Sequence, residues 1–116
     1  MGGYWGVSEP PPNDAIIALE SVLGPESTRE IVRLFLHDFP ESVRRIEAAG
    51  REDQMRIVHG IKSSALHMGA TALSERMAAL EGRLGDPGAT LAPEDLAEAV
   101  ADFAAVEPGL RDYGGR

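Results

Sequence analysis

Among the side chains of this sequence, His59 is the one whose surrounding residues best suit covalent chemistry. Histidine has a reference pKa of about 6.5, so near neutral pH an exposed ring often carries a free lone pair and can act as a nucleophile without a dedicated base. Its attack on a phosphoryl group would give a phosphoimidazole. Lys62, one helical turn later on the same face, would offset the negative charge of that group. The spacing thus indicates a phosphoryl-accepting site.

Small residues flank this pair and leave room for a second protein. Gly60 follows His59 and Ser63 follows Lys62, so the active site of a partner could come close to the ring. The hydroxyl of Ser63 could also hydrogen-bond to phosphoryl oxygens. Ser63 is therefore a possible third member of the site.

Charge and apolar surface near the histidine favour docking of a partner. Residues 54–74 contain no acidic side chain, and the formal charges there belong to Arg56 and Lys62. We therefore expect a locally basic patch on an acidic protein. Met55 and Leu66 lie one and two turns from the histidine and supply apolar surface of the kind that marks docking sites. The predicted docking residues are Met55, Arg56, Gly60 and Leu66.

Helical periodicity predicts how the histidine is displayed. At about 100° per residue, one side of the helix should face the core, with Val58 at its margin. His59 falls roughly 160° from Ile61 and Met68, so its ring should project into solvent. The predicted core side consists of Ile57, Ile61, Ala65 and Met68.

Two helices are predicted before the histidine helix. Asn13 or Asp14 should cap a short first helix that stops at Gly24-Pro25. The S-x-x-E spacing of Ser27 and Glu30 predicts a capping box at the start of a long second helix. The expected apolar stripes are Ile16, Leu19 and Leu23 in the first, and Ile31, Leu34, Phe35, Phe39, Val43 and Ile46 in the second.

Proline and glycine predict where the long helices bend or end. Pro40 should bend the second helix and Gly50 should end it. Gly69 should close the histidine helix, and Thr71 should cap the next one. Pro108 should end or bend a last helix that begins at Pro93. The expected stripes of these last two helices are Leu73, Met77, Leu80 and Leu84, then Leu96, Val100, Phe103 and Val106.

The whole pattern predicts an all-α fold: an antiparallel four-helix bundle with a short extra N-terminal helix. No alternating β pattern appears in the sequence. Residues 1–13, rich in glycine and proline, should form a flexible tail, and residues 14–112 the domain. We expect a monomer.

Composition excludes several classes of function. The chain has 116 residues, 43% of them hydrophobic, which suits one domain with one core. The net charge of −8 argues against nucleic acid and against an anionic membrane as partners. The sequence lacks cysteine, which fits the cytoplasm, and lacks a secretory signal. It also lacks a nucleotide-binding glycine motif, so we expect no ATP-dependent kinase activity.

The stretch from His59 to Glu81 resembles the signature of histidine phosphotransfer (HPt) domains of two-component phosphorelays. That signature has a phosphorylated histidine, a lysine three residues later, small residues, a glycine ten after the histidine, and leucines ending in Leu-Glu. Here it is matched by His59, Lys62, Ser63-Ser64, Gly69-Ala70, Leu73 and Leu80-Glu81. A helix resembling the one that precedes it in the family, Phe35-Leu36 to Phe39-Pro40, extends the likeness to about residues 14–107.

The resemblance implies a function and its partners. His59 would be the phosphoacceptor and Lys62 the residue that assists the phosphate, in reversible transfer with phosphoaspartates of receiver domains. Response-regulator receivers and a hybrid sensor histidine kinase would be the partners. The protein would need no cofactor, because the receiver brings the Mg²⁺. Ser63 stands where the family often has glycine, which affects partner choice more than chemistry.

Three alternatives stay open on the sequence. The helical module could bind partners without ever being phosphorylated, or it could be a fragment of a larger sensor kinase, although a start at Met1 favours a stand-alone carrier. A metal site built from His37, His59 and His67 is the third. Two of those histidines are eight residues apart on one helix, about 12 Å along its axis and too far to share an ion.

Overall fold

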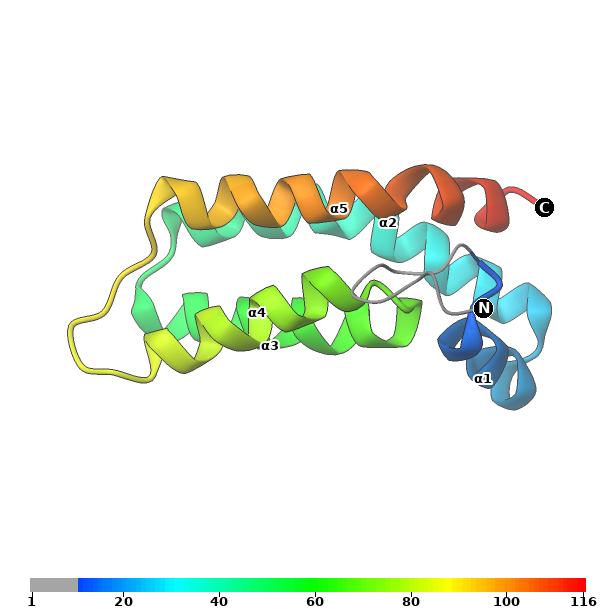
Figure 1. The fold of residues 1–116 in the computed structure, drawn as a ribbon, viewed down its shortest axis with the longest axis horizontal. Helices are drawn as coiled ribbons and strands as arrows, with labels where there is room; N and C mark the ends of the chain where they lie inside the picture. Colours follow the sequence, from blue (N-terminus) through cyan, green and yellow to red (C-terminus); the bar gives the residue numbers. More distant parts are fainter. Residues whose placement is uncertain (1–10) are drawn as a thin grey trace, which may run out of the picture.

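The computed structural model describes residues 11–116, and this part of the chain contains five helices and no strand (Figure 1). The short helix is α1 (Asp14–Leu23). The long helices are α2 (Pro25–Ala48), α3 (Arg51–Met68), α4 (Thr71–Leu84) and α5 (Pro93–Gly114). The predicted all-α class and the short extra helix are therefore confirmed.

The four long helices run antiparallel to their neighbours and close into a bundle. Each packs against the next along the chain, and α5 returns to pack against α2 (Figure 1). Helix α1 covers one end of the bundle, where it contacts α2 and α3. Short connections favour this arrangement, because consecutive helices then have to run back along one another.

One apolar core fills the bundle, and an aromatic cluster joins its two longest helices. Phe39 of α2 stacks on Phe103 of α5 with 4.2 Å between ring centroids, and Phe35 packs on both rings. The predicted stripe of α4 is confirmed completely. Its buried members are Leu73, Met77, Leu80 and Leu84.

The other stripes are right in period but wrong at single positions. In α2, Val32 and Leu36 are buried and Leu34 is 58% exposed. In α5, Ala99 is buried and Val100 is exposed. Periodicity defines the direction of a stripe but leaves neighbouring positions at its edge nearly equivalent. Leu23, the last residue of α1, is also exposed.

The ends of α1 and α3 are joined by Asn13, whose predicted capping role is confirmed. Its side-chain oxygen accepts a hydrogen bond from the backbone N–H of Ile16 at 2.9 Å, and its amide donates to the carbonyl of Met68 at 3.1 Å. Gly69 then ends α3 in the left-handed conformation, with φ of +74°. One side chain thus connects the start of α1 to the end of α3.

The predicted capping box at Ser27 is wrong, because α2 begins earlier. Gly24 is the N-cap and Pro25 the first helical residue, a position that suits the fixed φ of proline. Thr28 is buried in the first turn and donates its hydroxyl to the carbonyl of Gly24 at 2.8 Å. Thr71 is likewise the first residue of α4 and not its cap. Neither Pro40 nor Pro108 ends its helix.

Residues 1–10 of the predicted flexible tail lie outside the described residues. Within the described part, packing extends beyond both predicted domain limits: Asn13 is buried at one end and Tyr113 at the other. The Tyr113 hydroxyl donates to Glu20 of α1, and burial, followed by that carboxylate, raises the pKa of Tyr113 to about 12. No helix of residues 11–116 is both long and apolar enough to cross a lipid bilayer.

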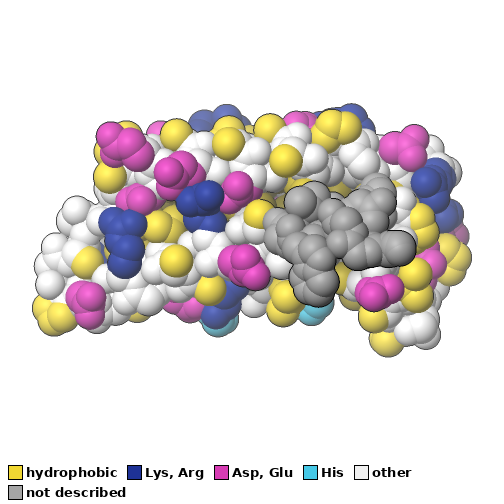
Figure 2. Space-filling model, in the orientation of Figure 1, with side chains coloured by type: hydrophobic (Ala, Val, Ile, Leu, Met, Phe, Trp, Pro, Cys, Tyr) yellow, Lys and Arg dark blue, Asp and Glu magenta, His cyan; other side chains and the backbone are white. Residues whose placement is uncertain are grey.

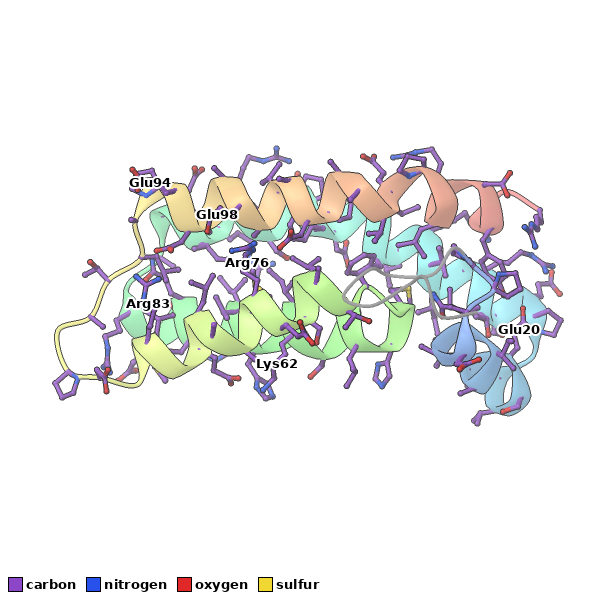
Figure 3. The ribbon with its side chains drawn as sticks, viewed as in Figure 1. Glu20, Lys62, Arg76, Arg83, Glu94 and Glu98 are labelled. Carbon is purple, nitrogen blue, oxygen red and sulfur yellow. The ribbon has the colours of Figure 1, made fainter. Side chains whose placement is uncertain are left out.

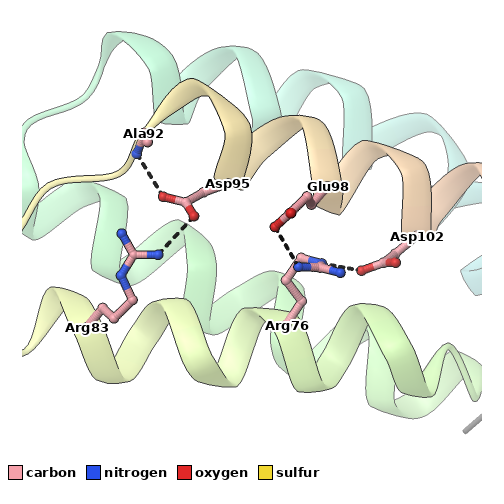
Figure 4. Close-up of polar contacts among 6 residues, drawn as sticks. All are labelled: Arg76, Arg83, Ala92, Asp95, Glu98 and Asp102. Atoms are coloured by element: carbon pink, nitrogen blue, oxygen red, sulfur yellow. Dashed lines mark hydrogen bonds and ion pairs between the residues drawn. The ribbon is translucent and has the colours of Figure 1, made fainter.

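A ladder of ion pairs joins α4 to α5 (Figure 4). Arg76 binds Glu98 at 2.8 Å and also Asp102, while Arg83 binds Asp95 at 2.8 Å. Arg83, and secondarily the backbone N–H of Ala92, lower the pKa of the Asp95 carboxyl against the opposing effect of burial. The ladder adds polar contacts between α4 and α5 to those of the core.

Candidate functional site

His59 lies in the middle of α3 with 59% of its side chain exposed. Val58, Ile61, Ala65 and Met68 are the buried residues of this helix, so its core side is centred slightly closer to Val58 than periodicity indicated. Ile57 is half-buried. The histidine consequently stands on the outer surface, as the sequence predicts, but it leans toward α4.

Glu81 of α4 contacts both polar side chains of the predicted site. Its Oε2 lies 2.6 Å from Nδ1 of His59, and its Oε1 lies 2.5 Å from Nζ of Lys62. The prediction that no acidic group surrounds His59 is therefore wrong for the folded protein. Residues 54–74 themselves contain no acidic side chain, but Glu81 approaches from α4. An acid 22 residues later in the sequence, on the next helix, completes a three-residue cluster.

The α3–α4 hairpin explains why these residues meet. His59 and Glu81 lie almost equally far from the turn at Gly69-Ala70, on its two sides, so two antiparallel helices bring them opposite each other. Ser74 strengthens the pairing, because its hydroxyl donates to the carbonyl of Lys62 at 3.2 Å. Counting back from the turn is the sequence signal that could have found Glu81.

The cluster faces away from the ion-pair ladder. In Figure 3, Lys62 lies on the side of α4 opposite to α5, whereas Arg76 and Arg83 lie between α4 and α5. Figure 2 shows histidine side chains at the lower edge of the molecule, one of them beside a basic side chain. The charged residues of α4 thus form two separate sets. Arg76 and Arg83 pair with residues of α5, and Glu81 contacts His59.

The electrostatics of the cluster depend on its carboxylate. The hydrogen bond from Lys62, and after it the bond from His59, lower the pKa of Glu81, while partial burial acts in the opposite direction. Glu81 is therefore ionised at neutral pH. An ionised carboxylate only accepts hydrogen bonds, so the Nδ1 atom that it contacts must carry a hydrogen.

On the other side of His59, a groove of about 610 Å³ separates α3 from α2. Gly60 contributes to its wall, and a Cβ built on Gly60 would meet nothing within 4 Å. Apolar and charged side chains both line the groove. Its lining includes Leu34, Phe39, Arg45, Ile57, Gly60 and Ser64.

The structure distributes the other predicted site residues over several surroundings. Leu66 is 63% exposed, as a docking residue should be, but Met55 is half-buried and packs against the core. Arg56 is exposed and pairs with Asp53 at 2.7 Å, so its charge is partly compensated. Ser63 is half-buried next to Lys62.

The alternative of a histidine metal site receives no support. Within residues 11–116, no three histidine, aspartate or glutamate side chains are grouped so that they could hold a metal ion. His37 lies on α2 beside Asp38, away from the cluster around Glu81.

Fold and site together define a class: a helical bundle that displays a histidine, with a lysine and a carboxylate beside it, on one of its long helices. A family model for the Hpt domain matches residues 30–109, which cover α3, α4 and most of α2 and α5. The chain therefore belongs to the Hpt domain family, whose role is histidine phosphotransfer in phosphorelays. The comparisons with curated proteins and with solved structures gave no match.

Proposed function

We propose that the protein carries a phosphoryl group between phosphoaspartates of receiver domains, with His59 as the phosphoacceptor. The observation that carries this proposal is the placement of His59: its ring is mostly exposed and has a cation one turn away. Family membership gives the type of chemistry. Exposure alone does not choose among the histidines, because the side chain of His37 is 78% exposed. The choice of His59 is supported by the residues that follow it at the family's spacing, Lys62, Gly69 and Leu80-Glu81.

The transfer step balances without a base from this chain. The lone pair on Nε2 attacks phosphorus, an N–P bond forms, and the O–P bond of the acyl phosphate breaks and returns its electron pair to the aspartate carboxylate. Transfer to the next receiver is the reverse step. The receiver would supply Mg²⁺ for the phosphoryl group, so we propose no metal or cofactor for this chain.

Lys62 would stabilise the transferred group. Its ammonium is bound to Glu81, and the side chain, one turn from His59, is 31% exposed. Since the ammonium group has three N–H donors, it can bind phosphoryl oxygens and keep the carboxylate. Ser63, also beside the site, is the proposed secondary donor.

Docking would take place on α3 and the groove beside it. Gly60 has no packing reason to be glycine, since nothing within the described residues occupies the position of its Cβ. A glycine inside a helix costs about 0.5–1 kcal/mol relative to alanine, so close approach of a partner gives this one a purpose. The proposed contact residues are Gly60, Leu66, Arg56 and the exposed part of Met55, with receivers and a hybrid sensor kinase as partners.

The test is incubation of the full chain with several phosphorylated receivers. Wild type should gain an acid-labile, alkali-stable label, and His59→Gln should abolish it, whereas the matched variant His67→Gln should retain it. Wild type that stays unlabelled with every receiver would favour the alternative of a binding module without phosphorylation. Label that persists in His59→Gln would move the phosphoacceptor to another residue.

A further inference from the structure

The groove between α2 and α3 is lined by four charged side chains, and two of them balance each other. Asp53 and Arg56, both on α3, are exposed and lie 2.7 Å apart. The other two, Asp38 and Arg45, belong to α2. Within residues 11–116, neither of these is paired with a charged group across the groove. The charges available to a partner therefore lie on the α2 wall.

Arg45 is a cation without a partner in the described part of the chain. Its side chain is exposed, and its guanidinium makes no hydrogen bond or ion pair with any residue that the structure describes. Arg44, the residue before it, lies outside the groove and binds Glu41. A guanidinium has five N–H donors in a planar fork that suits a carboxylate. Arg45 can thus bind an acidic side chain that a partner brings into the groove.

Asp38 places a negative charge at a fixed distance from Arg45. Its carboxylate contacts Nδ1 of the adjacent His37 at 3.3 Å, and its side chain remains 58% exposed. Seven residues, or two helical turns, separate Asp38 from Arg45. Both therefore lie on one side of α2, about 10 Å apart along its axis. The two opposite charges are thus ordered along the groove.

An exposed leucine adds an apolar position at one end of this wall. Leu34 lies one turn before Asp38, lines the groove and is 58% exposed. Phe39 and Ile61, which also line the groove, are buried in the core. A large exposed apolar side chain beside such a groove marks an interaction surface. From the N-terminal end of α2, the wall therefore has an apolar, an acidic and a basic position.

We propose that this groove selects receivers by a helix with the complementary order: an apolar residue against Leu34, a basic one against Asp38 and an acidic one against Arg45. The inference rests on the proposed function for the receiver as partner. A helix laid along α2 has the same rise of about 1.5 Å per residue, so its basic and acidic residues should be about seven positions apart. A receiver with the opposite order would meet like charges at both positions.

The first test compares two neighbouring arginines of the full chain. The initial rate of phosphoryl uptake is measured with the receiver that labels wild type fastest, at a receiver concentration below saturation. Arg45→Glu should lower this rate about tenfold, because it sets two acidic groups against each other. Arg44→Glu changes the net charge equally outside the groove and should lower it less than about twofold. Equal losses in the two variants would overturn the proposal.

The acidic position has its own matched pair of variants. Asp38→Lys should slow uptake more than Glu41→Lys does, since Glu41 is exposed on the same helix but lies outside the groove. All of these side chains are exposed, so the fold should persist, which urea denaturation checks. Uptake that is insensitive to the charge at position 38 would remove the acidic position from the proposed order.

A charge reversal on the receiver provides the readout that a merely structural role would not move. Acidic residues on the surface helices of the receiver are changed to lysine one at a time. One of these changes should slow uptake by wild type and be compensated by Arg45→Glu, which restores opposite charges. A receiver in which no acidic residue couples to position 45 in this way would refute the role of Arg45.

Binding of unphosphorylated receivers separates this proposal from the proposed function, because binding requires no chemistry at His59. Calorimetric titration measures the Kd. Receivers that never label wild type but bind it more tightly than they bind Arg45→Glu would refute phosphotransfer and still support the groove. Labelling at the same rate in Arg45→Glu and Arg44→Glu would do the opposite. Receivers that neither label nor bind wild type would refute both.

Discussion

Asn13 lies directly against Gly69, and the contact is so close that a Cβ on the glycine would overlap the asparagine side chain. Gly69 is also the residue at which the chain leaves α3 with φ of +74° and turns into α4. The turn that brings Glu81 opposite His59 therefore requires glycine for two independent reasons, its backbone conformation and the space taken by Asn13.

Gly69→Ala should consequently lower the free energy of unfolding by about 2 kcal/mol or more, from about 1–2 kcal/mol for the left-handed conformation and about 1 kcal/mol for the disturbed cap. Urea denaturation measures the loss. Gly88→Ala is the matched control, since Gly88 also has positive φ but an open Cβ position. Equal losses in the two variants would show that the Asn13 contact contributes nothing.

Gly60→Ala should separate stability from function. The Cβ position is open, so alanine should stabilise the protein by about 0.5–1 kcal/mol through helix propensity. Gly82→Ala, an open glycine inside α4, should stabilise it similarly. If a receiver approaches along the groove, Gly60→Ala should nevertheless slow phosphoryl uptake. Wild-type uptake rates in Gly60→Ala would remove this residue from the docking surface.

Lys62→Ala should leave the fold intact and weaken the phosphorylated state. The side chain is one-third exposed, and its ammonium binds Glu81 and not the core. Loss of the cation should slow phosphoryl uptake or shorten the lifetime of phosphohistidine, and both are measured by following the label over time. Lys62→Arg, which keeps the charge, is the control. Kinetics that match wild type in Lys62→Ala would exclude the lysine from the mechanism.

The lowered pKa of Glu81 predicts a pH dependence of stability. A carboxyl whose pKa is depressed in the folded state contributes stability above its unfolded value, here 4.5, and loses it as pH falls through the folded value. The difference in unfolding free energy between wild type and Glu81→Ala should therefore shrink as pH falls below about 4.5. Urea denaturation at a series of pH values measures it, and a difference that stays unchanged between pH 4.5 and pH 2 would contradict the lowered pKa.

The sequence predicts the parts of this molecule that depend on local chemistry. The stripe of α4, the exposure of His59 and the cap at Asn13 follow from period and residue type, because each depends on neighbours within a turn or two. Glu81 belongs to the resemblance but receives no role from it, since its contact with His59 is made between helices. Whether Ala99 or Val100 is buried also depends on contacts between helices, which the periodicity within one helix does not predict.

Leu80→Ala should show whether the face of α4 that carries the core is assigned correctly. Leu80 is 3% exposed in the bundle core, next to the carboxylate that contacts His59, so truncation should cost about 2–5 kcal/mol through lost burial and a cavity. Leu66→Ala is the matched control, because the same substitution at a side chain 63% exposed should cost under about 0.5 kcal/mol. Denaturant unfolding compares the two. Since Leu66 is a proposed docking residue, its variant should instead slow phosphoryl uptake, and a loss of stability at Leu80 as small as that at Leu66 would mean that α4 is turned the wrong way.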